Sequence, residues 1–324
     1  MTPGDTSLGQ QTMIGTVRLG TRASKLALAQ SGTVADALDR CPGCTVEIVH
    51  VTTHGDTSHA PIAELGSTGV FTSALREALL SGDIDIAVHS YKDLPTAPAP
   101  GISLAAVPKR ENPADVLVAR DGLTLATLPP GARVGTGAPR RVSQLRAFRA
   151  DLEIVPIRGN IDTRMGKVTG GELDAVVIAY AGVSRLGRLA DVTEVIADDI
   201  VLPAPAQGAL AVECRTEGPL ADMLTILDDP NSRAAVAAER AVLAEVDLAT
   251  SVWCDSTVAA HAVPAVGEDG EVTLALTASV TATDGSDAIR MSATGNVRDA
   301  DGLGRRLAAA LLDAGAAELM EKRT

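Results

Sequence analysis

The chain has 324 residues, of which 46% are hydrophobic and 2% are aromatic, and its formal net charge is −13. This length allows about two or three domains with aliphatic cores, and the negative charge argues against nucleic acid or an anionic membrane as a partner. Residues 1–16 have neither the basic start nor the apolar run of a signal peptide, and we expect a disordered tail there. Since no apolar stretch approaches the ~20 residues of a membrane helix, we expect a cytoplasmic protein.

In the first third of the chain, strands alternate with helices, which is typical of a doubly wound α/β domain. The apolar pattern predicts five strands and two helices in this part, with the helices at residues 24–39 and 71–81 and the strands at residues 17–20, 45–52, 84–88, 104–107 and 116–119. A polar turn separates the last two strands. We expect the chain to cross to a second domain there, near residues 108–115.

The middle third repeats this order, with strands at residues 133–135, 153–157 and 175–179 and helices at residues 139–148 and 162–170. The proline-rich segment at residues 203–208 interrupts the pattern, and we expect the next strand, at residues 209–214, to return to the first domain. A helix and a small α/β tail follow, with strands at residues 257–263, 272–281 and 289–295 between helices at residues 232–246 and 301–320.

This order predicts an α/β fold with two similar doubly wound lobes around a cleft, like the periplasmic binding proteins, and a small C-terminal α/β domain. The predicted domains are residues 17–110 with 209–228, residues 115–203, and residues 232–324.

Lys92 and Asp93 directly follow the strand at residues 84–88, and Pro95 stops that strand from continuing. Four of the five strand residues are apolar, as expected of a central strand covered on both faces. In open α/β sheets the carboxyl ends of the strands face the ligand crevice, so this pair lies where binding or chemistry is expected. The alternative is a solvated ion pair in a loop.

Arginines recur at predicted strand ends and helix starts, namely Arg22, Arg140, Arg141, Arg158, Arg164 and Arg185. Each alone is typical of a surface arginine, but their equivalent positions in the two lobes predict a shared site. Because guanidinium groups pair with carboxylates in a bidentate manner, this set predicts a substrate that carries several carboxylates or phosphates. The chain contains no P-loop or dinucleotide-binding fingerprint.

Cys41 and Cys44 have the spacing of a redox or metal site, but they fall in a turn between a helix and a strand. A tetrahedral zinc site needs a second pair of ligands, which the pattern does not supply. A surface turn is therefore favoured, and we expect no metal.

Five ordered segments resemble the porphobilinogen deaminase family, also called hydroxymethylbilane synthase. They are LGTRAS at residues 19–24, HSYKDLP at 89–95, VGTGAPRR at 134–141, IRGNIDTR at 157–164 and LPAPAQGA at 202–209. The resemblance extends from about Val17 to the C-terminus. It implies a monomeric transferase that condenses four porphobilinogen molecules, with loss of ammonia, into the linear tetrapyrrole hydroxymethylbilane.

The resemblance also implies a role for each matching residue. Asp93 is the catalytic carboxylate, which stabilises the electron-poor azafulvene formed when ammonia leaves and helps to move protons. The resemblance implies that the arginines hold the acetate and propionate groups, that Lys92 holds substrate carboxylates or the geometry of Asp93, and that Phe71 is the aromatic residue that borders the site. The residues that line the cofactor and substrate site are Arg22, Ser24, Phe71, Lys92, Thr136, Arg140, Arg141, Arg158, Arg164, Arg185 and Gln207.

Members of this family carry a dipyrromethane primer on a cysteine, through a thioether, in a Gly-Gly-Cys turn. An ungapped count from the preceding helix puts Thr250 at this position, and a few inserted residues put Cys254 there. We favour Cys254, because residues 257–260 then align with the strand that follows the cysteine. Two alternatives stay open: an inactive or repurposed paralogue of the deaminase, and a non-catalytic bilobed protein that binds carboxylates.

Overall fold

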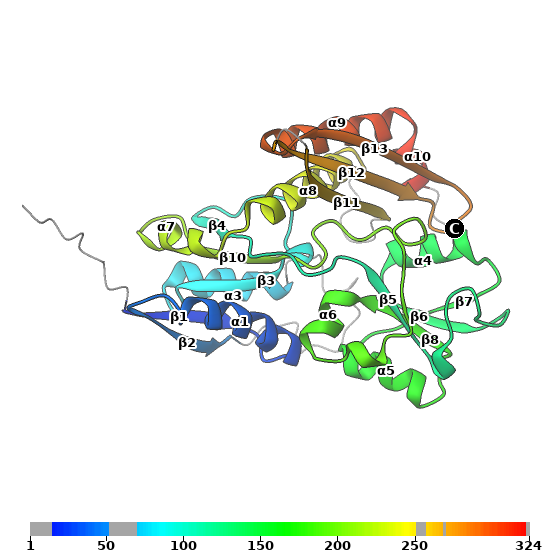
Figure 1. Ribbon diagram of the computed structural model, residues 1–324, viewed down its shortest axis with the longest axis horizontal. Coiled ribbons are helices and arrows are strands. Elements are labelled where there is room, and N and C mark those ends of the chain that lie inside the picture. The colour runs from blue at the N-terminus through cyan, green and yellow to red at the C-terminus, as the bar shows by residue number, and fades with distance from the viewer. Residues whose placement is uncertain (1–14, 52–69, 251–256, 268–269, 322–324) are drawn as a thin grey trace, which may run out of the picture.

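The computed structural model describes residues 15–51, 70–250, 257–267 and 270–321. Three sheets organise this part of the chain, two of five strands and one of three (Figure 1). Short 3-10 helices lie in the connections, at η1 (Tyr91–Asp93), η2 (Arg120–Gly122), η3 (Leu189–Asp191), η4 (Thr225–Leu227) and η5 (Val297–Asp299).

The first lobe is built on the sheet β2-β1-β3-β10-β4. Strand β1 is parallel to β2 and β3, whereas β10 is antiparallel to both β3 and β4. The strands are β1 (Gly15–Thr21), β2 (Cys44–His50), β3 (Ile86–Ser90), β4 (Ile102–Ala106) and β10 (Leu210–Arg215), and the helices are α1 (Lys25–Leu38), α3 (Val70–Ser81) and α7 (Leu220–Leu224).

Strand β1 begins at Gly15, two residues inside the predicted tail at residues 1–16. Gly15 and Thr16 belong to the ladder between β1 and β2, where they lie opposite Cys44 and Thr45. The prediction for these two residues was therefore wrong, because pairing with a neighbouring strand orders a polar segment that has no apolar pattern of its own. The rest of the predicted tail lies outside the described residues.

The second lobe repeats this topology in the sheet β7-β6-β8-β5-β9. Here β6 is parallel to β7 and β8, and β5 is antiparallel to β8 and β9. The strands are β5 (Asp115–Ala119), β6 (Arg133–Thr136), β7 (Glu153–Pro156), β8 (Ala175–Ala179) and β9 (Glu194–Val195), and the helices are α4 (Pro139–Phe148), α5 (Ile161–Thr169) and α6 (Tyr180–Arg185). The two lobes confirm the predicted α/β class.

The C-terminal part packs helices against one face of an antiparallel sheet, with a core that joins α8 and α9 to β11 and β12 (Figure 1). Its elements are α8 (Pro230–Thr250), β11 (Val258–Val266), β12 (Val272–Thr281), β13 (Ala288–Asn296), α9 (Ala300–Asp313) and α10 (Ala316–Glu321). The single closing helix predicted at residues 301–320 was wrong, since Gly315, with φ of +95°, separates α9 from α10. The domain boundaries given above stay predictions.

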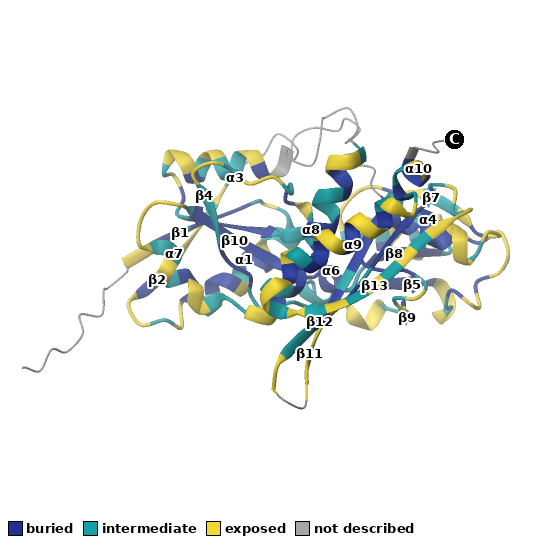
Figure 2. Cartoon of the chain, turned by 90° about the horizontal axis from the view of Figure 1, so that it is seen from above, coloured by how far each residue is buried: buried dark blue, intermediate teal, exposed yellow. Residues whose placement is uncertain are grey.

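Two crossing segments join the lobes, one from β4 to β5 and one from β9 to β10. They lie against each other, and the Glu111 amide donates to the Gly208 carbonyl oxygen at 3.3 Å. Gly208 has φ of +87°, and a Cβ there would lie 2.4 Å from the Glu111 carbonyl oxygen, so the close approach requires glycine. Buried residues run through this middle region of the molecule (Figure 2).

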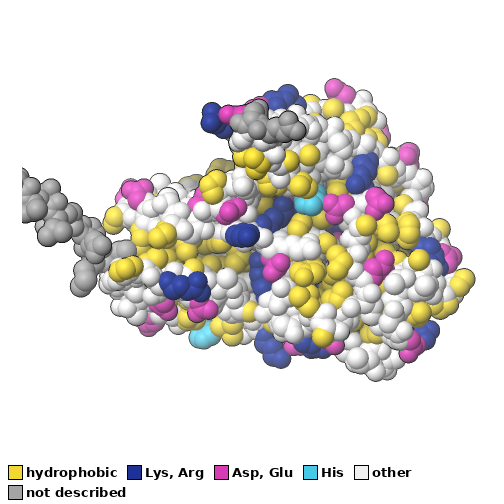
Figure 3. Space-filling view, viewed as in Figure 1, with side chains coloured by type: hydrophobic (Ala, Val, Ile, Leu, Met, Phe, Trp, Pro, Cys, Tyr) yellow, Lys and Arg dark blue, Asp and Glu magenta, His cyan; other side chains and the backbone are white. Residues whose placement is uncertain are grey.

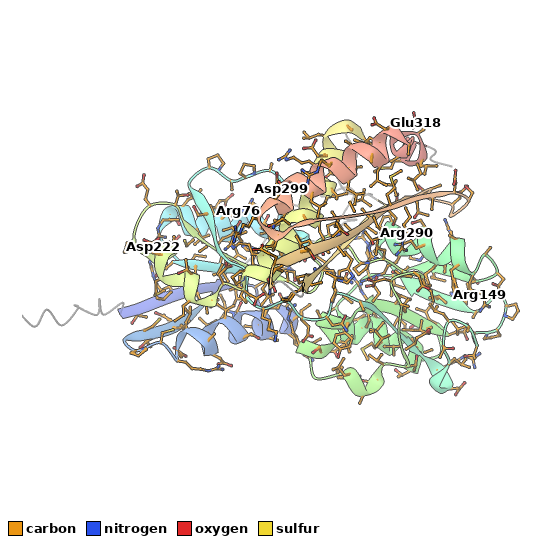
Figure 4. All side chains as sticks on the ribbon, turned by 45° about the horizontal axis from the view of Figure 1, so that its top comes forward. Arg76, Arg149, Asp222, Arg290, Asp299 and Glu318 are labelled. Atoms are coloured by element: carbon orange, nitrogen blue, oxygen red, sulfur yellow. The ribbon has the colours of Figure 1, made fainter. Side chains whose placement is uncertain are left out.

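Helix α8 ties the C-terminal part to the crossing segments through the fully buried Glu239. Its carboxylate accepts two hydrogen bonds from Arg110, at 2.6 and 2.9 Å, and one from each of the Ala206 and Ala262 amides, at 2.7 and 2.8 Å. A second tie runs from Arg290 on β13, where Nη1 donates to the Asp198 carbonyl oxygen at 2.9 Å (Figure 4). The three parts therefore meet around one junction.

Candidate functional site at the junction of the lobes

Strand β3 delivers Lys92 and Asp93 to the junction. Its residues are buried up to His89, and the chain then turns through η1. Asp93 is exposed, whereas Lys92 is half-buried and donates from Nζ to Gln207 Oε1 at 3.1 Å. Removal from water, followed in size by the positive charge of Arg141, lowers the pKa of Lys92 to about 8. The two neighbours are thus separated, the ammonium held inward and the carboxylate in contact with solvent.

The second lobe contributes Arg140 and Arg141 from the first turn of α4. Pro139 begins this helix, where its missing N–H costs nothing and its fixed φ suits the helix. Both guanidinium groups are buried, and they bond to opposite oxygens of the fully buried Asp115, each at 2.8 Å. These two positive charges hold the pKa of Asp115 well below its usual range, against the opposing effect of burial.

Gln207, on the second crossing segment, connects the two lobes. Its Oε1 accepts from Lys92 of the first lobe and from Arg141 Nη2 of the second lobe, at 3.1 and 3.4 Å. Its Nε2 donates to Asp115 Oδ1 at 2.7 Å and to the Pro113 carbonyl oxygen at 2.6 Å. The buried amide of Gln207 therefore brings together two other predicted residues, Lys92 and Arg141.

The junction carries more positive than negative charge. Lys92, Arg140 and Arg141 surround Asp115, which is the carboxylate bonded to both of the arginines. Lys and Arg side chains are visible near the centre of the face in Figure 3, where the three parts of the molecule meet. Since buried charge without a counter-charge is costly, this excess favours an anionic ligand.

Two buried polar atoms in the same region have no hydrogen-bond partner among the described residues, Thr136 Oγ1 and Arg141 Nε. Thr136 is fully buried at the end of β6, immediately before the turn that leads to α4. Leaving a buried polar atom unpaired costs free energy of about 1–3 kcal/mol. Such atoms are compatible with a site whose remaining partners come from a polar ligand.

Arg164 and Arg185 stand beside this cluster. Arg164 Nε donates to the Gly159 carbonyl oxygen at 2.8 Å, and Arg185 Nη2 donates to that of Gly208 at 2.6 Å. Desolvation lowers the pKa of both guanidinium groups, and the charge of Arg141 adds to the effect on Arg164. The structure therefore brings Arg164 close to Arg141 and fastens Arg185 to the second crossing segment.

The remaining predicted residues are Arg22, Arg158, Ser24, Phe71 and Cys254. Arg22 is half-buried just after β1, and Arg158 is exposed just after β7. Ser24 caps α1, since its Oγ accepts from the Ala27 amide at 3.2 Å. Phe71 belongs to α3, but its side chain is not among those described, and Cys254 lies outside the described residues.

Thr250 ends α8, and its hydroxyl donates to the Val246 carbonyl oxygen at 2.8 Å. Cys41 lies in the predicted turn between α1 and β2, which is closed by a bond from the Cys44 amide to the Cys41 carbonyl oxygen at 3.2 Å. Cys44 is instead the buried first residue of β2, so the prediction of a surface turn was wrong for this residue, because pairing with β1 takes it into the sheet. Among the described residues, no group of three or more His, Cys, Asp or Glu side chains could hold a metal ion.

Sequence reasoning missed Asp115 and Glu239. Asp115 stands at the start of an apolar strand, and Glu239 lies on the buried face of α8. Each acidic residue occupies a position where the hydrophobic pattern predicts an apolar one. Since fully buried carboxylates are nearly always paired, such a position indicates a buried ion pair.

Asp247, in the last turns of α8, is a buried carboxyl group whose Oδ1 has no hydrogen-bond partner among the described residues. Desolvation raises its pKa from 3.8 to about 7, although the charge of Arg240 acts in the opposite direction. Between these two values the folded state holds a proton that the unfolded state has lost. Stability from this group is therefore complete below pH 3.8 and is lost as the pH rises toward 7.

We therefore expect Asp247→Asn to raise the melting temperature, by an amount that grows between pH 5 and pH 8, because asparagine needs no proton to be neutral. Thermal unfolding of both proteins across this range measures the difference. Asp313→Asn, at an exposed carboxylate on α9, is the control and should give a difference that does not change with pH. A constant difference for Asp247→Asn would show that its carboxyl titrates normally.

Comparison with known proteins identifies the family. A family model described as porphobilinogen deaminase, dipyromethane cofactor binding domain, matches residues 17–222, and the model of the porphobilinogen deaminase C-terminal domain matches residues 234–313. The porphobilinogen deaminase of Thermobifida fusca is 54% identical over 313 residues, which cover 94% of this chain and 95% of the relative. The chain belongs to the porphobilinogen deaminase family.

A further deaminase, from Mycobacterium tuberculosis, is 54% identical over 309 residues, which cover 94% of this chain and 98% of the relative. Among solved structures, the VFT2 domain of Bordetella pertussis BvgS aligns with a TM-score of 0.40 at 17% identity, over 66% of this chain and 85% of that one. The deaminase relatives confirm the predicted enzyme, a transferase, and do not support a repurposed paralogue or a mere carboxylate-binding protein. No described helix is both long and apolar enough to cross a membrane.

Proposed function

We propose that the junction of the lobes is the active site, in which this deaminase joins four porphobilinogen molecules into hydroxymethylbilane. The observation that carries the proposal is the buried, positively charged cluster around Asp115, next to the exposed carboxylate of Asp93. We further propose that the enzyme acts in the cytoplasm as a monomer, on a dipyrromethane primer bound to Cys254.

The chemistry of the substrate matches the charge of the cluster. Each porphobilinogen carries an acetate and a propionate, so a growing chain of pyrroles adds two negative charges per ring. Lys92, Arg140 and Arg141 exceed the single buried charge of Asp115, and Arg164 adds another cation nearby. Carboxylates of substrate and primer would balance this excess with charge-assisted hydrogen bonds. Thr136 Oγ1 and Arg141 Nε are further donors that lack a partner among the described residues.

Asp93 would act on the pyrrole itself. When ammonia leaves the aminomethyl group, positive charge develops on the ring, and a fixed carboxylate nearby stabilises it. The exposure of Asp93 leaves this side chain free to meet a substrate. Lys92, with a pKa of about 8, is largely protonated at neutral pH and would bind a substrate carboxylate.

The primer, when bound, supplies the pyrrole carbon to which the first substrate is joined. Cys254 is favoured as its anchor, because a thioether requires a thiol. Thr250, the other position considered, carries a hydroxyl that already bonds to the Val246 carbonyl oxygen. Helix α8, which ends four residues before Cys254, leads from the buried Glu239 at the crossing segments toward this position.

The expected result for the attachment site is a covalent mass equal to dipyrromethane on the purified protein, absent from Cys254→Ser. Intact-protein mass spectrometry, before and after incubation with porphobilinogen, measures it. Cys41→Ser, at a half-buried thiol in the turn between α1 and β2, should keep the added mass. An unmodified wild-type protein that stays unmodified with porphobilinogen would contradict the function, whereas a modified Cys254→Ser would contradict only the anchor.

A further inference from the structure

Arg240, on α8, contacts the turn that carries Lys92 and Asp93. Its Nη1 donates to the carbonyl oxygens of Tyr91 and Leu94, at 3.2 and 3.0 Å, and its Nη2 donates to that of Pro95 at 2.6 Å. The guanidinium carbon also lies 4.5 Å from the centre of the Tyr91 ring, in a cation–π contact. One side chain thus holds the backbone on both sides of Asp93.

This use of an arginine is costly. Desolvation lowers the pKa of Arg240, and the hydrogen bonds described for its guanidinium go to backbone carbonyl oxygens of the turn, which carry no counter-charge. Within the turn itself, the Leu94 amide donates to the Tyr91 carbonyl oxygen at 3.2 Å. A guanidinium has several donors in a planar fork, so its three hydrogen bonds to carbonyl oxygens add to this single bond in holding the turn.

We propose that Arg240 is a positioning residue for Asp93, so that α8 sets the place of the catalytic carboxylate. The inference rests on the proposed role of Asp93. Glu239, which precedes Arg240 on α8, binds the crossing segments. Helix α8 ends at Thr250, four residues before Cys254 in the sequence. One helix, α8, therefore contacts both the crossing segments and the turn that carries Asp93. A displacement of about 1 Å at a reacting group can cost 100-fold in rate.

A purely structural role is the alternative, in which Arg240 only fastens α8 to the first lobe. Arg233, two turns earlier on α8, serves that purpose through hydrogen bonds to residues outside the turn, although its charge also acts on the Tyr91 hydroxyl. Its Nε donates to Asp228 at 2.8 Å and its Nη2 donates to the Ala105 carbonyl oxygen at 3.0 Å. Arg233→Gln is therefore a matched control on the same helix and against the same lobe.

The test compares Arg240→Gln, Arg240→Lys and Arg233→Gln in the primer-loaded enzyme. We expect Arg240→Gln to lower kcat by about 10- to 100-fold with little change in KM, and Arg240→Lys to recover part of the loss because it keeps a charged donor. Amide hydrogen exchange at residues 91–94, the part of the turn that carries backbone N–H groups, should be faster in Arg240→Gln than in the wild type. Arg233→Gln should keep both kcat and the exchange rate of this turn, even where it lowers the melting temperature.

A wild-type kcat in Arg240→Gln, or an equal loss of kcat in Arg233→Gln, would overturn the inference. If Arg240→Gln does not fold, a loss of kcat in Arg240→Lys with wild-type exchange at residues 91–94 would overturn it as well, because the loss of rate would then not come from a looser turn. Full turnover in Asp93→Asn would instead remove the proposed role of Asp93. The two failures are distinct, because the exchange rate of the turn does not depend on what Asp93 does.

Discussion

Replacement of Asp93 by asparagine is expected to lower kcat by about 10²- to 10⁴-fold, the range typical of a lost acid–base or charge-stabilising group. The amide has the size of the carboxylate but cannot carry its charge. Because Asp93 is exposed, we expect the melting temperature to stay at the wild-type value. Release of ammonia and formation of the tetrapyrrole, followed at saturating porphobilinogen, measure the effect.

Asp83→Asn provides the control for this variant. Asp83 is also exposed, but it precedes β3, so it lies at the opposite end of the strand that delivers Asp93. We expect its kcat to match that of the wild type. If Asp93→Asn keeps its turnover within about two-fold of the wild type, the carboxylate takes no part in the chemistry.

Replacement of Asp115 by asparagine is expected to destabilise the fold by about 3–5 kcal/mol, the cost of breaking a buried ion pair by removing one partner. Arg140 and Arg141 would then lie buried beside a neutral amide, and the NH2 group that replaces one carboxylate oxygen would face a donor, either that of Arg140 or those of Arg141 and Gln207. Equilibrium unfolding in urea measures the change. The pKa of Asp115 lies far below neutral pH, so the effect should not vary between pH 6 and pH 8.

Asp174, a more exposed carboxylate of the second lobe, provides a control for Asp115→Asn. Asp174 accepts from Arg120 Nε at 2.6 Å and from the Arg133 amide at 2.7 Å, but this cluster is open to solvent. Asp174→Asn should therefore cost about 1 kcal/mol or less. Equal losses for the two variants would mean that the buried cluster is not held by charge.

The sequence predicted those site residues whose position follows from the local order of strands, turns and helices. Lys92 and Asp93 follow a buried strand, and Arg140 and Arg141 follow a strand, a short turn and a helix-starting proline, so their positions at strand ends could be derived. The strand at residues 272–281 also matches β12 at both ends. Local patterns decide these features, and local patterns are visible in a sequence.

The contacts that organise the site are of a different kind. Glu239 and Arg110 are separated by 129 residues, and Arg240 and Leu94 by 146. No periodicity links such residues, because they meet only after two crossings between the lobes. Gln207 was predicted through the family resemblance, but its place between Lys92, Arg141 and Asp115 follows from the close approach of the crossing segments at Gly208.

The return of β10 to the first sheet has a consequence for the order of folding. Every strand of the second sheet lies within residues 115–195, whereas the first sheet needs β10, at residues 210–215, to join β3 to β4. A ribosome makes the first lobe earlier but releases it without its fourth strand. We infer that the nascent chain completes its second lobe first, and that the edges of β3 and β4 must stay protected from aggregation until β10 emerges.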